Sequence, residues 1–301
     1  MKNKIAVLGG DLRQYTAAIE LSRKEWDVSL WGLDISEKKD HNICFCDNYR
    51  DAVRGAVGVV LPLPASNDGI YLNCPLSASR EGVRLSQLVE ETDKDCMIVG
   101  GRIPDVVFQS AKTLGIAVND YFMSEDFQIK NAYITAEAAL SIAMNSLNRN
   151  IYGAKIAITG YGRIAKHLVR LLSGMGADIT VAARKTSDLA WSACNGCDVL
   201  KIGDSDILKK NIFKLANGYD IIYNTVPTWL FDRSFLESVD KNTFIIDLAS
   251  VPGGVDVKAA KELGANVLWA TSLPGKYAPA SAGELIASCV DRILRGEGAE
   301  V

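Results

Sequence analysis

Short runs of apolar, β-branched residues alternate with stretches of helical periodicity along the whole chain. This alternation is typical of parallel sheets whose strands are connected by helices. The pattern predicts one series of strands in the first half, over residues 4–8, 27–31, 57–61, 96–99 and 116–118. It predicts a second series over residues 155–159, 178–182, 199–201, 220–224, 243–247 and 266–269. We therefore expect an α/β fold with two doubly wound sheets.

Two helical stretches suggest how these sheets are divided between domains. Residues 135–144 combine high helix propensity with an apolar stripe, and they fall between the two strand series. We interpret them as a linking helix, with domain 1 over residues 1–150 and domain 2 over residues 151–301. Residues 281–294 carry apolar side chains at helical spacing. We expect this closing helix to pack back onto the first domain.

Composition limits the classes of partner. The chain has 301 residues, 48% of them hydrophobic, which is a length typical of two cored domains. Lys and Arg number 33 against 36 Asp and Glu, giving a net charge of -3. A global basic field for nucleic acid or an anionic membrane is therefore absent, and any anion site must be local.

Localisation follows from the cysteines and from the apolar runs. The seven cysteines form an odd number without a regular framework, which favours a reducing, cytoplasmic compartment. No apolar stretch approaches the ~18 residues of a membrane span, and the apolar run at the N-terminus is too short for a signal-peptide core. We expect a protein that is neither exported nor embedded.

The sharpest motif is a glycine turn that directly follows a predicted strand and directly precedes a predicted helix. It reads Gly160-Tyr161-Gly162-Arg163-Ile164-Ala165. A dinucleotide site needs Gly160 for the tight turn, Gly162 for close approach to the pyrophosphate, and a small third residue for helix packing. This motif predicts a Rossmann-like cofactor domain, and the alternative is a turn that is merely structural.

The end of the next strand indicates which cofactor is bound. An NAD site usually places an acidic residue here, whereas an NADP site uses a cation for the 2′-phosphate. This chain has Arg184, followed by Lys185 and Thr186. Since an arginine fork can pair with a phosphate and stack on adenine, the sequence favours NADP. A solvated Arg-Lys pair at a strand end is the alternative.

Two further loops follow strands of the same predicted sheet, at the edge where ligands of open α/β sheets bind. The first contains Asn224, Thr225, Val226 and Pro227, and the second runs from Asp247 through Ala249 to a Pro-Gly-Gly sequence. We expect these loops to cover the nicotinamide half of the cofactor. Ordinary turns would use the same Pro and Gly residues.

The first domain opens with a different glycine turn. Asp11 follows Gly9 and Gly10, where a pyrophosphate would lie, and a carboxylate there repels phosphate. We therefore expect no second dinucleotide site, and we expect Asp11 to cap the following helix. Arg13 is a candidate to hold a substrate carboxylate, with a surface role as the alternative.

Other chemistry-bearing residues are sparse. His41 lies in a polar stretch and is interpreted as loop, and His167 is interpreted as a residue on the face of the helix after the glycine turn. Neither is a strong candidate for an acid-base catalyst, so the catalytic residue stays unassigned. Cys194 and Cys197 form a solitary CxxC without a second pair, and we expect no metal site.

Taken together, blocks along nearly the whole chain resemble the dipicolinate synthase A subunit of spore-forming bacteria. These blocks are residues 9–14, 61–64 with 68–69, 131–132 with 135–137, 160–163, 224–227, 247–256, and 273–279 with 282–284. The later blocks are specific as a set, although the glycine turn alone would not separate this family from other dehydrogenases.

The resemblance implies an NADP-linked oxidoreductase that makes pyridine-2,6-dicarboxylate from a dihydrodipicolinate-type precursor. It implies a branch of lysine biosynthesis that operates in the cytoplasm of the mother cell during sporulation. A flavoprotein-like B subunit is expected as partner, and an oligomer is expected. Because aromatisation drives the oxidation, the protein must mainly orient the ring and hold two carboxylates. Arg13 and Lys276 are the candidate carboxylate ligands.

Two other classes stay open at this point. One is a regulatory subunit that binds NADP only to sense redox state, which the absence of an obvious acid-base cluster favours. The other is an oxidoreductase similar to shikimate or amino-acid dehydrogenases. That class needs a Lys-Asp proton-transfer pair in the first domain, where no lysine stands out as buried and catalytic.

Overall fold

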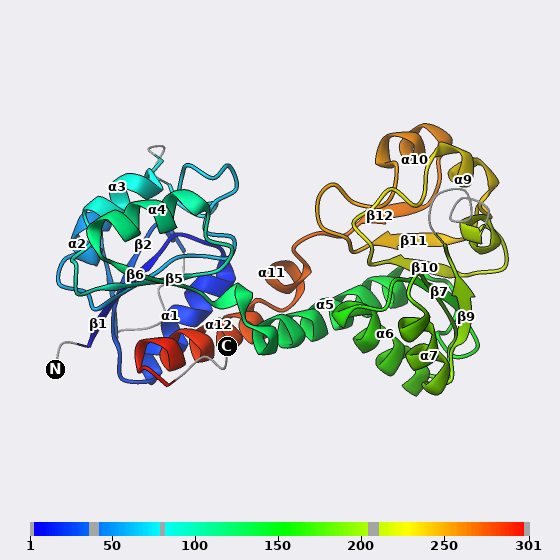
Figure 1. Cartoon of the computed structure of the whole chain (residues 1–301), viewed down its shortest axis with the longest axis horizontal. Helices are drawn as coiled ribbons and strands as arrows, with labels where there is room; N and C mark the ends of the chain where they lie inside the picture. The colour runs from blue at the N-terminus through cyan, green and yellow to red at the C-terminus, as the bar shows by residue number, and fades with distance from the viewer. Residues whose placement is uncertain (1–2, 36–41, 79–81, 204–210, 298–301) are drawn as a thin grey trace. The chain divides into compact units, whose positions relative to one another are not determined.

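The computed structural model describes residues 3–35, 42–78, 82–203 and 211–297. Its contacts divide the chain into two compact units, each built around a sheet of its own (Figure 1). The first unit combines Met1–Asn131 with Pro274–Val301, and the second is Ala132–Leu273. The chain therefore leaves the first unit once and returns to it at its end.

Parallel strands form the centre of the first unit. They are β1 (Lys4–Leu8), β2 (Asp27–Trp31), β3 (Ile43–Phe45), β4 (Gly58–Val60), β5 (Met97–Gly100) and β6 (Ala117–Asp120). The helical elements are α1 (Leu12–Arg23), α2 (Tyr49–Val53), α3 (Leu85–Glu90), α4 (Asp105–Leu114), the 3-10 turn η1 (Tyr121–Met123) and α12 (Pro279–Leu294). The strand order is β3-β2-β1-β4-β5-β6, the order of a doubly wound dinucleotide-binding sheet.

The second unit repeats this plan. Its strands are β7 (Lys155–Thr159), β8 (Asp178–Ala183), β9 (Asp198–Lys201), β10 (Ile221–Asn224), β11 (Phe244–Asp247) and β12 (Val267–Trp269). Its helical elements are α6 (Arg163–Gly174), α7 (Thr186–Cys194), the 3-10 turn η2 (Phe213–Leu215), α9 (Arg233–Ser238) and α10 (Val257–Leu263). The order β12-β11-β10-β7-β8-β9 is the same doubly wound order, so the predicted α/β class with two Rossmann-like sheets is confirmed.

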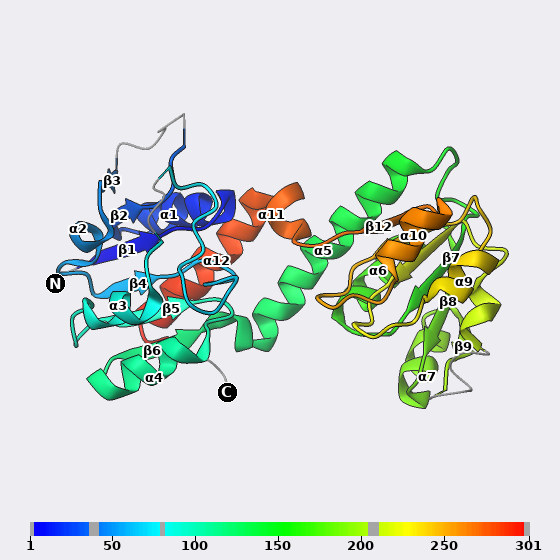
Figure 2. The same ribbon diagram turned by 90° about the horizontal axis from the view of Figure 1, so that it is seen from above.

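Helices cover both faces of each sheet, as Figures 1 and 2 show. In the first unit α2, α3 and α4 enclose one core layer, and α1 with α12 encloses the other. In the second unit α6 and α7 lie on one face, and α9 and α10 on the other. This burial on both faces explains why the strands read as continuous apolar runs.

The division into units differs from the predicted boundary near residue 150. It falls inside the long helix α5 (Glu125–Ser146), because this helix contributes to two cores. Phe127 packs in the first unit, whereas Ala139 and Ile142 pack with the second. The predicted linking segment, residues 135–144, lies within the part of α5 that belongs to the second unit.

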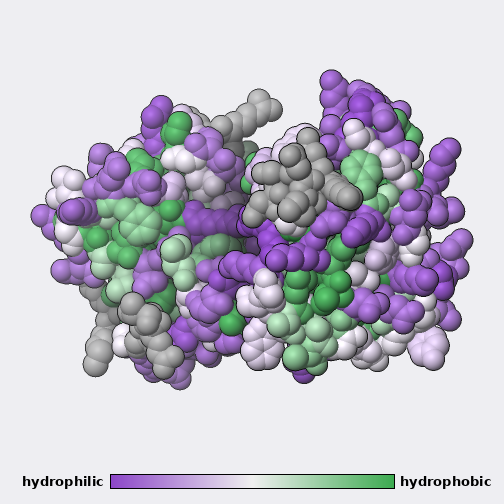
Figure 3. All heavy atoms as spheres, turned by 45° about the vertical axis from the view of Figure 1, so that its right-hand side comes forward, coloured by the Kyte–Doolittle hydropathy of each residue, from purple (hydrophilic) through white to green (hydrophobic). Residues whose placement is uncertain are grey.

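The closing helix α12 packs against α1 within the first unit. Gly283 makes this possible, because a Cβ there would lie 2.5 Å from the Thr16 Cβ and 2.6 Å from the Arg13 carbonyl oxygen. The short helix α11 (Leu273–Tyr277) leads into α12. In the described part of the chain, no helix is both long and apolar enough to span a membrane. Hydrophilic residues cover much of the face shown in Figure 3.

Asp291 fastens α12 to the end of α1. It accepts hydrogen bonds from Trp26 Nε1 at 2.8 Å and Arg295 Nε at 2.7 Å, and Lys24 Nζ lies 3.3 Å away. Burial alone would raise the pKa of this carboxyl, but these donors outweigh burial and hold the pKa below its ordinary value. A lowered pKa stabilises the fold above about pH 4, and this contribution is lost as pH falls through the folded-state pKa.

We therefore expect Asp291→Asn to lower the free energy of unfolding at pH 7 by about 1–2 kcal/mol. The difference from the wild-type protein should shrink as the pH falls from 5 to 3. Urea denaturation across this pH series measures it, and Glu90→Gln, at an exposed position on α3, is the charge-matched control. A difference that stays constant with pH would show that the carboxylate charge contributes nothing.

Candidate dinucleotide site

The glycine turn after β7 has the geometry that its sequence predicts. Gly160 has φ +83°, and a Cβ there would lie 2.8 Å from Thr225 Oγ1 and 2.9 Å from Val226 Cγ2. Its backbone N–H donates to the Ala182 carbonyl oxygen at 2.8 Å. Only glycine fits here, because the φ value and the close approach each exclude a side chain.

The first turn of α6 offers donors for an anion. Gly162 is the N-cap residue, no side chain caps the helix, and a Cβ at Gly162 would meet no atom within 4 Å. Backbone N–H groups at a helix start, beside open space and the positive end of the helix dipole, suit a pyrophosphate. Of the next two residues, Arg163 is exposed and Ile164 is half-buried against the core.

A pocket of about 170 Å³ lies at the carboxyl end of β8. The predicted residues that line it are Gly160, Arg184, Lys185 and Val226, while Thr186 is the exposed first residue of α7. Lining residues that the sequence did not predict are Ala183, Asp188, Ile202, Thr228 and Leu230. Apolar walls beside a glycine turn and two cations fit the adenosine end of a dinucleotide.

Two predicted cofactor residues, Asn224 and Asp247, are fully buried, and their side chains form a hydrogen bond with each other. Asn224 Nδ2 donates to Asp247 Oδ1 at 2.7 Å, and Asn224 Oδ1 accepts from Thr159 Oγ1 at 2.5 Å. The two side chains thereby connect the carboxyl ends of β7, β10 and β11. Their polar groups stabilise the edge of the sheet rather than facing a ligand.

The same network fixes the two loops that follow β10 and β11. Asp247 accepts hydrogen bonds from Ala249 N at 3.1 Å and from Gly254 N at 2.8 Å. Its carboxylate therefore holds the backbone of the second loop at two points. In the first loop Asn224 accepts from Val226 N at 3.1 Å. Thr225 Oγ1 donates to the Thr159 carbonyl oxygen at 2.7 Å. Pro227 is exposed and Ala249 is buried.

The glycine turn of the first unit is occupied by its own chain. Gly10 N donates to the Asn73 carbonyl oxygen at 2.8 Å, and a Cβ at Gly9 would lie 2.6 Å from Cys74 Sγ. Asp11 accepts from Arg13 N at 3.0 Å as the N-cap of α1, which confirms its predicted capping role. A neighbouring loop therefore covers the position that a pyrophosphate would need.

Arg13 is nearly buried, and its guanidinium is largely committed inside the first unit. Nε and Nη2 donate to the Asp11 carboxylate, and Nη2 also donates to the Leu63 carbonyl oxygen at 2.6 Å. A Cβ on Gly275 would lie 2.8 Å from Arg13 Nε, so α11 packs directly on this ion pair. Lys276, the next residue on α11, is exposed.

The remaining candidates have ordinary structural environments. His167 lies on α6 with its ring 5.2 Å from the Tyr133 ring, which confirms the prediction of a helix-face residue. Cys194 is exposed and Cys197 is buried, and burial raises the pKa of the Cys197 thiol. Among the described residues no group of three or more His, Cys, Asp and Glu could hold a metal ion. His41 lies outside the described residues.

Two doubly wound sheets, one of them with a glycine turn at an uncapped helix start, define a protein with two Rossmann-like domains. The apo-structure of D-lactate dehydrogenase from Escherichia coli shares the fold, with a TM-score of 0.58 at 14% identity over 99% of this chain and 98% of that one. At this identity the likeness concerns the fold alone.

The sequence places the chain more narrowly. Residues 4–122 match the family described as the N-terminal domain of the dipicolinate synthase A subunit. The chain is 29% identical to the dipicolinate synthase A subunit of Bacillus subtilis over 97% of its length and 95% of that protein. The crystal structure of the corresponding protein from Bacillus halodurans superposes with a TM-score of 0.83 at 25% identity, covering 98% of both chains. The chain is therefore similar to dipicolinate synthase A subunits over nearly its whole length, as its motifs predicted.

Proposed function

We propose that this chain is the dinucleotide-binding subunit of a dipicolinate synthase and catalyses NADP-linked oxidation of a dihydrodipicolinate-type precursor to pyridine-2,6-dicarboxylate. The observation that carries this proposal is the uncapped start of α6 beside a pocket that Arg184 and Lys185 line. The helix start suits the pyrophosphate, and the two cations suit the 2′-phosphate that distinguishes NADP from NAD.

Bound NADP⁺ would supply the acceptor for the hydride that leaves the dihydropyridine ring. The chain's own residues then have two tasks, since aromatisation provides much of the driving force: they hold the ring against the nicotinamide and they hold its carboxylates. The loops after β10 and β11 are the proposed cover of the nicotinamide half. Asn224 and Asp247 serve this role by fixing the loop backbones.

Arg13 and Lys276 are the proposed ligands of the substrate carboxylates. The hydrogen bonds that Arg13 donates to Asp11 and Leu63 use Nε and Nη2, which leaves Nη1 for a ligand. Lys276 is exposed and follows Gly275, the residue that packs on the Arg13 guanidinium. The pair thus offers two positive groups for a dianionic substrate.

The family supports further proposals about partners and place. The relatives are named as one subunit of a synthase, which implies a second subunit. We propose that this second subunit is the flavoprotein-like B subunit. We also propose an oligomer that acts in the cytoplasm of the mother cell of a sporulating bacterium.

The test follows NADP⁺ reduction by the purified chain with freshly generated dihydrodipicolinate, with and without the candidate B subunit. Turnover to pyridine-2,6-dicarboxylate is expected with the partner present. Lys276→Met should raise the KM for this substrate and leave NADPH binding nearly unchanged. If neither mixture reduces NADP⁺ while NADPH still binds, the proposed reaction is wrong. The chain is then a cofactor-sensing subunit or a different dehydrogenase.

A further inference from the structure

Arg102 holds a backbone conformation that an arginine rarely adopts. Its φ is +52°, in the left-handed region where a side chain crowds the backbone. Glu25 also has a positive φ, at +68°, but it directly follows the end of α1, where a left-handed residue commonly closes a helix. Arg102 instead follows strand β5 and Gly101, and no helix ends there. A glycine would adopt this φ without strain, which indicates a use for the arginine side chain.

Asp120 holds the loop that carries Arg102 in place. Its carboxylate accepts hydrogen bonds from Arg102 N at 3.1 Å, Ile103 N at 2.9 Å and Phe122 N at 2.9 Å. These bonds join the loop after β5 to the turn η1 after β6. Arg102 Cζ lies 4.6 Å from the centre of the Phe122 ring, so the ring covers one face of the guanidinium. Stacking of this kind orients the planar fork and leaves the N–H groups at its edge open.

The Arg102 guanidinium has no polar partner of its own. The residue is exposed, and its side chain forms no hydrogen bond or ion pair with any residue that the structure describes. A planar fork that is held in orientation but unpaired is suited to bind a carboxylate through two parallel hydrogen bonds.

Arg102 lies at the same edge of the first sheet as Arg13. The strands are parallel, so the loops after β1, β4 and β5 all leave the sheet at that edge. The Leu63 carbonyl oxygen accepts from Arg13 Nη2 at 2.6 Å, and a Cβ on Gly101 would lie 2.8 Å from Leu63 Cδ1. Leu63 therefore contacts both the Arg13 guanidinium and the segment that carries Arg102.

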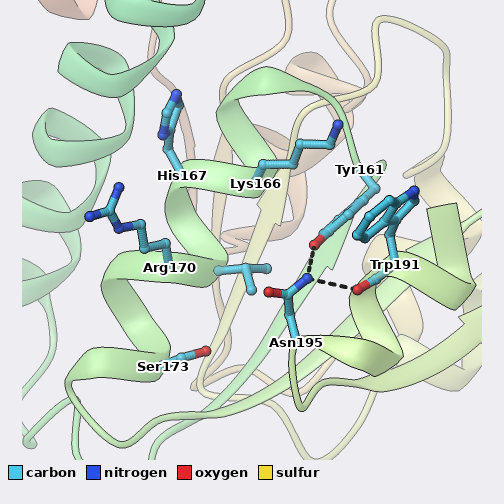
Figure 4. Close-up of a pocket in the computed structure, with 8 residues that line it drawn as sticks. Tyr161, Lys166, His167, Arg170, Ser173, Trp191 and Asn195 are labelled. Carbon is cyan, nitrogen blue, oxygen red and sulfur yellow. Dashed lines mark hydrogen bonds between the residues drawn. The ribbon is translucent and has the colours of Figure 1, made fainter.

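The exposed cations of α6 lack these features. Figure 4 shows Lys166 and Arg170, which line the groove between α6 and α7. Lys166 extends toward Tyr161 whereas Arg170 extends away from it, so their charges do not converge on one ligand. Both belong to a regular helix, where the backbone is unstrained. Arg170 is therefore a suitable reference for the removal of an exposed arginine.

We propose that Arg102 binds the second carboxylate of the substrate and makes the first unit selective for dicarboxylates over monocarboxylates. Arg13, through Nη1, and Lys276 then share the first carboxylate. This inference rests on the proposed function for the identity of the natural ligand, a dihydropyridine dicarboxylate. The strained, stacked and unpaired state of Arg102 does not depend on that identity.

Isothermal titration calorimetry of the full chain measures the binding of pyridine-2,6-dicarboxylate and of pyridine-2-carboxylate, each with and without saturating NADPH. The wild-type chain is expected to bind the dicarboxylate at least tenfold more tightly. Arg102→Gly should lower the affinity for the dicarboxylate at least tenfold and leave the affinity for the monocarboxylate nearly unchanged. Arg102→Lys keeps the charge but loses the fork, so it should recover part of the lost affinity.

Urea denaturation of the same variants separates ligand binding from a structural role. Arg102→Gly relieves the positive φ, so its urea midpoint should equal or exceed that of the wild-type chain. Glu25→Gly is the matched control, because it relieves the same kind of strain and also removes an exposed charged side chain. Arg170→Met removes an exposed arginine from the second unit. Both controls should bind the two ligands as the wild-type chain does.

Three results would overturn the inference. The first is equal affinity of the wild-type chain and Arg102→Gly for the dicarboxylate. The second is a wild-type chain that binds both ligands equally or binds neither. The third is a lower urea midpoint of Arg102→Gly with an equal loss of both ligands, because the arginine then serves the fold.

Failure of this inference stays separate from failure of the proposed function. Calorimetry measures dicarboxylate binding whether or not the chain turns over. If Arg102→Gly reduces NADP⁺ with an unchanged KM for the substrate, the reaction stands and the inference is wrong. If turnover is absent while Arg102→Gly still loses affinity for the dicarboxylate, the proposed reaction is wrong and the dicarboxylate site stands.

Discussion

Replacement of Asp247 by alanine is expected to lower the free energy of unfolding of the second unit by about 3–5 kcal/mol. The carboxylate is fully buried and accepts from Asn224 Nδ2, Ala249 N and Gly254 N. Removing it leaves these donors inside the protein without an acceptor, and each unsatisfied buried donor costs about 1–3 kcal/mol. The loops after β10 and β11 lose their common anchor, so NADPH binding should weaken as well.

Urea denaturation followed by tryptophan fluorescence measures the loss. Asp256→Ala is the matched control, because Asp256 accepts from a single backbone group, Ala259 N, as the N-cap of α10. Its loss should cost about 1 kcal/mol. Equal destabilisation by the two variants would mean that the buried network is no stronger than one helix cap.

Most strands and the glycine turn could be predicted because their signals are local. A buried parallel strand is a short apolar run, and the dinucleotide turn needs glycine at fixed positions. Strand β3 was not predicted, because Ile43–Phe45 has three residues at the edge of its sheet and carries no extended apolar run. Edge strands are short, so their hydrophobic pattern is weak.

The residues that line the proposed cofactor pocket were less predictable. Ile202 and Leu230 line it, but each lies far along the chain from the glycine turn and reads as an ordinary core residue. Only the strand order brings them to the same edge of the sheet. Nothing in a local motif indicates which apolar residues a fold of this kind will gather around a ligand.

The roles of the polar residues at the strand ends could not be predicted from the sequence for a different reason. Asn224 and Asp247 stand where ligands bind in open α/β sheets, yet the structure pairs them with each other. Arg13 likewise pairs with Asp11, only two residues away. A residue type that can bind a ligand can also satisfy a buried partner, and the sequence does not distinguish the two uses until the partner's position is known.

Charge reversal at Arg184 is expected to weaken NADPH binding by on the order of 2–4 kcal/mol, or about thirtyfold to a thousandfold. Arg184 and Lys185 line the pocket together with Asp188, so the pocket already contains one carboxylate. Arg184→Asp removes a cation from the proposed 2′-phosphate position and adds a second negative charge. NADH lacks this phosphate, so its binding should change much less.

Fluorescence titration with both cofactors on the same preparations measures this difference. Lys258→Asp, at an exposed position on α10, makes the same charge reversal outside the pocket and controls for the altered net charge. The decisive quantity is the ratio of the NADPH and NADH dissociation constants, because a general loss of fold would weaken both cofactors and leave that ratio unchanged. A ratio that stays constant in Arg184→Asp would place the arginine away from the 2′-phosphate and remove the argument for NADP over NAD.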